Sequence, residues 1–157
     1  MNKKTLIDLI GLTVLVAVVV IGYRFSPLLL PQADLVIEPP ATCDLHRQTC
    51  HVALPEGGGL ALSMQPQPIP LMAPFRVEVK LTAVEARSVE IDFAGVEMNM
   101  GLNRFSMSDQ GKGIWATEAS IPVCVTGRME WLATVMILRG QQRISVPFRF
   151  ISSGGNS

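Results

Sequence analysis

Residues 75–81 read Phe-Arg-Val-Glu-Val-Lys-Leu, so that apolar and charged side chains alternate without a break. Successive side chains of a strand point to opposite faces, and this stretch therefore predicts an antiparallel strand with one buried and one solvated face. The same two-residue period recurs at 60–64, 89–93, 115–121 and 144–150. Residues 130–138 are almost continuously apolar, which is typical of a central strand.

Turn signals separate these strands at intervals of about eight to twelve residues. The clearest is Asp-Gln-Gly-Lys-Gly at 109–113, which follows a short expected strand at 102–107. Beyond residue 24, apolar residues do not repeat with the 3.6-residue period of a helix over a convincing length. About seven or eight short strands in this arrangement predict an all-β fold, an antiparallel immunoglobulin-like β-sandwich.

The amino-terminal end differs in composition from the rest of the chain. Lys3 and Lys4 precede an apolar stretch over residues 5–23, and a membrane-spanning helix needs about 20 such residues. The two lysines favour a cytoplasmic amino terminus. Residues 1–24 are therefore predicted to be a single-pass transmembrane anchor. The alternative is a signal peptide cleaved near residues 32–34, Gln-Ala-Asp.

Residues 25–40 are expected to form a stiff stalk, because proline fixes φ and extends the chain. The four prolines of this stretch are Pro27, Pro31, Pro39 and Pro40. Residues 35–37 inside it are apolar enough to be a first edge strand. The exported sandwich is then expected over 41–151, followed by a polar, glycine-rich and disordered tail over 152–157.

All three cysteines lie beyond the predicted anchor, which indicates an oxidising compartment. Six residues separate Cys43 from Cys50, a spacing that suits a small loop closed by its own disulfide. This pairing is one of three that three cysteines allow, and it would leave Cys124 as a free thiol. In a bacterium, the predicted location is the inner membrane, with the carboxyl-terminal domain in the periplasm.

The charge and the motifs of the sequence argue against a nucleic-acid-binding protein and against an enzyme. Ten basic and twelve acidic residues lie beyond residue 24, so the exported part carries a formal charge of −2 and lacks the basic face of a nucleic-acid binder. No histidine–carboxylate pairing or nucleophile motif is present at a plausible spacing, and an enzyme is not expected. His46 and His51 are interpreted as solvated loop residues. Their alternative role is that of copper or zinc ligands.

Sulfur atoms form the candidate site. Met98 and Met100 point to the same face of an extended segment, and Cys124 ends a nearby expected strand. Met129 is a supplementary ligand candidate, and Met107 is a weaker one. Soft thioether and thiolate ligands select Cu(I) over hard cations. The competing interpretation is that these methionines fill gaps in the core.

The stretches Met98-Asn-Met-Gly101 and Gly113-Ile-Trp115, together with a short anchor and a small exported sandwich, resemble the FixH-like and YtkA-like group of membrane-anchored domains. The resemblance covers about residues 66–150. It implies a role in copper handling and in the maturation of respiratory haem-copper oxidases. Leu102 and Asn103 stand where that group's pattern has a histidine, and Cys124 does not belong to the pattern.

The sequence thus predicts a membrane-anchored periplasmic protein that binds Cu(I) and delivers it to a copper-accepting or respiratory-assembly partner. A blue-copper electron carrier is disfavoured, because no histidine follows Cys124 or accompanies Met98. The alternative is a non-metal envelope module that docks on a membrane complex through an edge strand or the proline-rich segment at 65–74.

Overall fold

The computed structural model of the chain describes residues 11–22, 35–97, 101, 103–122 and 128–152. Its two compact units are Met1–Ala33 and Asp34–Ser157. In the first unit, residues 11–22 form a helix, and the remainder of the expected anchor lies outside the described residues. Within the described ranges, no helix has both the length and the apolar character needed to cross a membrane.

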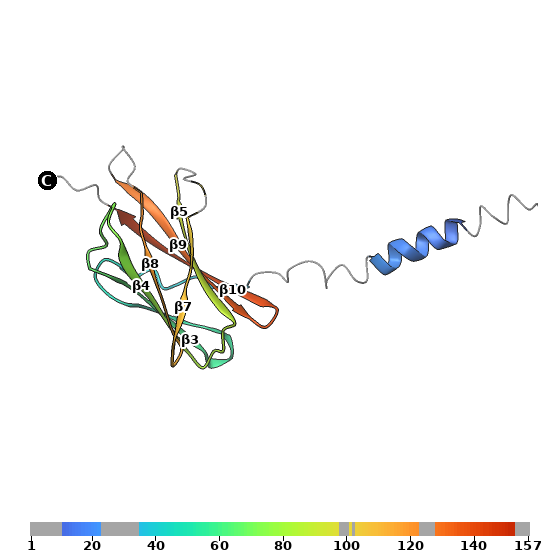
Figure 1. Ribbon diagram of the computed structural model, residues 1–157, viewed down its shortest axis with the longest axis horizontal. Coiled ribbons are helices and arrows are strands. Elements are labelled where there is room, and N and C mark those ends of the chain that lie inside the picture. The colour runs from blue at the N-terminus through green and yellow to red at the C-terminus, as the bar shows by residue number, and fades with distance from the viewer. Residues whose placement is uncertain (1–10, 23–34, 98–100, 102, 123–127, 153–157) are drawn as a thin grey trace, which may run out of the picture. The chain divides into compact units, whose positions relative to one another are not determined.

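The described part of the second unit contains ten strands and one short 3-10 helix, η1 (Pro55–Gly57) (Figure 1). The strands are β1 (Leu35–Val36), β2 (Cys50–Ala53), β3 (Gly59–Gln65), β4 (Phe75–Thr82), β5 (Ser88–Gly95), β6 (Arg104–Ser106), β7 (Ser108–Gly111), β8 (Ile114–Ala119), β9 (Met129–Arg139) and β10 (Gln142–Ser152).

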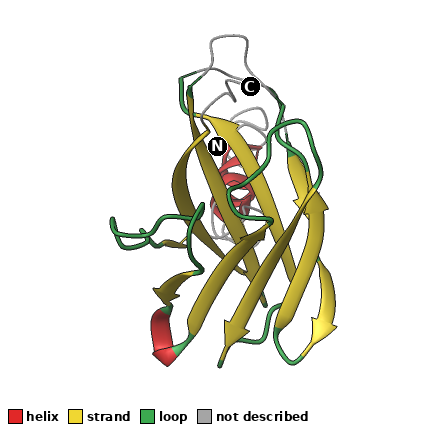
Figure 2. Cartoon of the chain, turned by 90° about the vertical axis from the view of Figure 1, so that its left-hand side faces the viewer, coloured by secondary structure: helices red, strands yellow, loops and turns green. Residues whose placement is uncertain are grey.

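Two five-stranded sheets contain these strands, in the orders β1-β10-β9-β5-β6 and β2-β3-β4-β8-β7. Neighbouring strands are antiparallel except for β1, which runs parallel to β10. Figure 2 shows the two sets of strands from the side. Strand β9 lies between β10 and β5, as expected of the near-continuous apolar stretch at 130–138. The predicted β-sandwich is confirmed.

The core lies between the two sheets because alternate side chains of each sheet point inward. Strand β4 buries Phe75, Val77 and Val79, whereas its intervening residues are exposed or half-buried. The Phe93 ring, on β5 of the other sheet, meets the Phe75 ring edge-on with 5.8 Å between centroids. It makes a similar contact with Phe150 of β10. Aromatic rings from both sheets therefore meet in one core.

Two predictions of local structure need correction. The turn expected over 109–113 is confined to Lys112 and Gly113, because Ser108–Gly111 forms strand β7. All four residues of β7 are exposed, so this edge strand lacks the alternation by which a half-buried strand is recognised. Ser152, which was expected to begin the tail, is the last residue of β10, and residues 153–157 lie outside the described residues.

Ser152 is a buried polar residue with a clear partner on each side. The Trp131 indole Nε1 donates a hydrogen bond of 2.9 Å to Ser152 Oγ. Ser152 Oγ in turn donates to the main-chain oxygen of Met129 over 3.3 Å. Both hydrogen bonds lie where β9 begins and β10 ends. The Ser152 hydroxyl therefore supplies the acceptor for a buried N–H group and links the two strand ends.

Replacing Ser152 by alanine is expected to lower the free energy of unfolding by about 1–3 kcal/mol, because the buried Trp131 N–H loses its acceptor. Urea unfolding followed by tryptophan fluorescence measures this change. Ser108→Ala on exposed β7 is the matched control and should stay within about 0.5 kcal/mol of the parent. Equal effects of the two substitutions would contradict the assigned role.

Candidate functional site

Met98, Met100 and Cys124 lie outside the described residues, but the residues that flank them are described. Strand β5 ends at Gly95, directly opposite Trp131 of β9. One residue later, the Val96 N–H donates a hydrogen bond of 3.0 Å to the Glu130 carbonyl oxygen. Residues 95–96, which precede Met98 and Met100, therefore lie beside residues 130–131, which follow the stretch that contains Cys124.

A second set of contacts joins the other two flanks. The Phe93 N–H donates to the Asn103 carbonyl oxygen over 3.0 Å, so the chain returns from the Met-x-Met stretch to β5. The Asn103 side-chain Nδ2 donates to the Ser120 carbonyl oxygen over 3.3 Å, just after β8 ends. All four flanks thus lie at one end of the sandwich, where β5 and β8 end and β9 begins. We call it the distal end.

Met129, the supplementary ligand candidate, is described and lies at this end. Its side chain is only 4% exposed and belongs to the core cluster. Met107, the weaker candidate, is also buried in that cluster. The burial of both thioethers is the arrangement expected of methionines that fill the core.

Cys43 and Cys50 form a disulfide, which confirms the predicted pairing. Cys50 is buried at the start of β2, whereas Cys43 is half-buried. Between them, Leu45 is fully buried and fixes the loop to the core. Cys124 is therefore the one cysteine of the sequence outside this disulfide.

His46 does not behave as the solvated loop residue that the sequence suggested. Its Nδ1 accepts a hydrogen bond from the Ile69 N–H (3.2 Å), and its Nε2 donates to the Ile151 carbonyl oxygen (2.9 Å). These contacts assign the proton to Nε2, because Nδ1 must accept. The Gln67 side chain also donates to the Leu45 carbonyl oxygen. His46 thus ties the disulfide loop both to the proline-rich segment and to β10.

With both ring nitrogens engaged, His46 has no lone pair to offer a metal ion. His51 lies on β2 with an exposed side chain. Among the residues that the structure describes, no three His, Cys, Asp or Glu side chains lie close enough together to hold a metal ion.

Met72 was not among the sulfur ligands expected from the sequence. It lies in the proline-rich segment, and its side chain is 76% exposed. The Met72 N–H donates a hydrogen bond of 3.2 Å to the Ile121 carbonyl oxygen, three residues before Cys124. Surrounding prolines indicated only an irregular connection, so the pairing with residue 121 was not recognisable from local sequence. The structure adds an exposed thioether to the distal end.

Neither a model of a known protein family nor a curated protein sequence matches this chain.

Replacing His46 by alanine is expected to lower the free energy of unfolding by about 1–2 kcal/mol, because an N–H and a carbonyl group lose their partners. The same substitution should leave the stoichiometry of Cu(I) binding unchanged. Urea unfolding and a Cu(I) titration on one preparation measure both quantities. His51→Ala, which removes an exposed imidazole, is the control and should change neither. Loss of Cu(I) binding by His46→Ala alone would contradict the structural role.

Proposed function

We propose that this protein is a membrane-anchored, exported Cu(I)-binding protein that delivers copper to a partner. The observation that carries the proposal is the convergence of the four flanks at the distal end. Val96 is hydrogen-bonded to Glu130, and Asn103 is hydrogen-bonded to Ser120. Two stretches that are about 25 residues apart in sequence, and that contain three candidate sulfur ligands, thus begin and end side by side.

Chain connectivity strengthens this argument. Only three residues separate Glu97 from Gly101, and Cys124 is the second residue after Pro122. Consecutive Cα atoms are about 3.8 Å apart, so the Cα atom of Cys124 is within roughly 8 Å of that of Pro122. The proposed ligands are Met98, Met100 and Cys124. Met129 is excluded from the set in this proposal because its thioether is buried in the core.

The proposed chemistry follows from the donor types. Two neutral thioethers and one thiolate are soft ligands of the kind that favour Cu(I). Thioethers bind more weakly than a thiolate, and ligands of mixed strength permit transfer by stepwise exchange with the sulfur atoms of a partner. A copper-accepting or respiratory-assembly protein is the proposed recipient. No catalytic activity is proposed.

Other features support the proposed membrane anchor, the proposed compartment and the immunoglobulin-like description of the fold. Residues 1–24 are proposed to anchor the chain in the inner membrane, and the apolar stretch at 5–23 supports this. The Cys43–Cys50 disulfide supports an oxidising compartment such as the periplasm. The immunoglobulin-like description of the sandwich is proposed on the basis of its two antiparallel-rich sheets.

Cu(I) competition with a chromophoric chelator tests the proposal on the full chain. The parent is expected to bind one Cu(I). Cys124→Ser, and the double variant Met98→Leu/Met100→Leu, should each weaken binding by about tenfold or more, which corresponds to about 1.4 kcal/mol. Met136→Leu on β9 is the matched methionine control and should bind like the parent. Unchanged affinity in both ligand variants would refute the proposed site.

Met72 supplies a separate prediction for the same site. Its main chain is hydrogen-bonded to Ile121 and its thioether is exposed, so Met72→Leu is expected to weaken Cu(I) binding by about threefold to tenfold without changing the stoichiometry. The same titration measures this effect. Unfolding in urea serves as the control measurement, because a side chain this exposed should contribute little to stability. Identical affinity would assign Met72 no part in the site.

A further inference from the structure

The first strand covers only a small part of the β10 edge. Leu35 pairs with Ile144 and Val36 pairs with Ser145, after which the Ile37 N–H donates to the Ser145 carbonyl oxygen. Near the other end of β10, the Ile151 carbonyl oxygen accepts the hydrogen bond from His46. The edge is therefore closed at two points that are six residues apart.

Between these points, the N–H and C=O groups of alternate β10 residues point away from β9, off the edge of the sheet. Alternate residues of a strand direct their N–H and C=O groups to the same side, and Ser145 and Ile151 both direct theirs away from β9. The Pro147 carbonyl and both main-chain groups of Arg149 share that parity. Within the described parts of the chain, no hydrogen bond reaches these three groups. They form a short length of unpaired strand edge.

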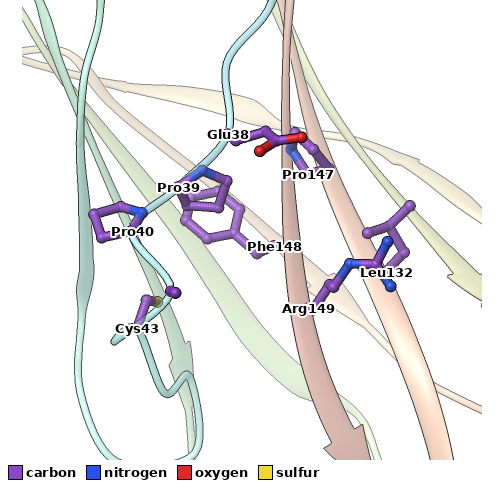
Figure 3. A pocket seen from close by; sticks show the side chains of 9 residues that line it. Glu38, Pro39, Pro40, Cys43, Leu132, Pro147, Phe148 and Arg149 are labelled. Carbon is purple, nitrogen blue, oxygen red and sulfur yellow. The ribbon is translucent and has the colours of Figure 1, made fainter.

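A cleft of about 440 Å³ lies along this unpaired edge (Figure 3). Pro39 and Pro40 form one wall, where the chain bows away from β10. The Phe148 ring of β10 is almost fully buried and extends toward Pro39, whereas Leu132 of β9 adds half-buried apolar surface beside Arg149. Its volume is within the range of about 300–1,000 Å³ that is typical of ligand sites.

Charge identifies the kind of occupant. The Arg149 side chain lines the cleft and is 64% exposed, even though it pairs with Glu130 over 3.0 Å. The residue opposite Arg149 on an added strand would lie on the same face, where an acidic side chain is favoured. Its two neighbours would point inward, toward Phe148 and the prolines. Glu38 lies near Pro147 in the cleft, which disfavours an acidic residue there.

We propose that this cleft binds an extended peptide segment of a partner protein, which adds to the open edge of β10 as a strand with an apolar–acidic–apolar sequence. Strand addition uses main-chain hydrogen bonds for affinity and alternate side chains for selectivity. The docking role considered from the sequence thus acquires a specific edge strand. This inference does not depend on copper binding, because its observations concern only β9, β10 and residues 38–43.

A second copy of the chain is the less favourable occupant. Antiparallel pairing of two β10 edges about Arg149 would place two arginines directly opposite each other, and like charges in such pairs are destabilising. Pro147 also lacks the N–H group that a symmetric pairing would use.

Fluorescence anisotropy tests the proposal with the full chain and a labelled heptapeptide that has a central Val-Glu-Val. The expected result is saturable binding, with about fivefold weaker binding of the Val-Lys-Val peptide. A Val-Glu-Val peptide that is N-methylated at its three central residues should also bind at least about fivefold more weakly, because its main-chain donors are blocked.

Arg149→Glu should reverse the order and favour Val-Lys-Val. Arg76→Glu is the matched control on the other sheet, because Arg76 also pairs with a glutamate on an outer face, and it should leave the order unchanged. Urea unfolding of both variants verifies that each is folded. Absence of saturable binding, equal binding of the N-methylated peptide, or an unchanged order in folded Arg149→Glu would overturn the proposal.

Discussion

The antiparallel ladder between β5 and β9 is the constraint on which the candidate site depends. It pairs every residue of β5 with β9, from Ser88 opposite Leu138 to Gly95 opposite Trp131, and the Val96–Glu130 hydrogen bond extends it by one step. A one-residue slip would turn the buried face of β5 outward, so burial of Val89, Ile91 and Phe93 fixes the register. The core thereby determines which flanking residues meet at the distal end.

Polar contacts complete that end of the sandwich. Ser152 joins the ends of β9 and β10, and His46 joins the disulfide loop to the proline-rich segment and to β10. The first strand begins beside Ile144, close to the β9–β10 turn at the other end of the sandwich. Under the proposed function, the sulfur ligands would thus lie at the end opposite to the start of the domain, a suitable position for transfer to a partner.

Alternation predicted the half-buried strands well, because their burial imposes a two-residue period. Residues 75–81 and 89–93 belong to β4 and β5, and the short spacing of Cys43 and Cys50 predicted their disulfide. Strand β7 was not predicted, because neither of its faces is buried and its sequence therefore does not alternate. The contacts of His46 and Met72 were not predictable either. They join residues far apart in sequence, through loops whose positions depend on the assembled sheets.

Copper K-edge X-ray absorption on the Cu(I)-loaded full chain, compared with Cys124→Ser, tests most directly whether the distal end gathers sulfur ligands. The proposed site predicts a first shell made only of sulfur in the parent, with one sulfur fewer in the variant. A first shell of nitrogen or oxygen atoms, or identical spectra for the two proteins, would contradict it.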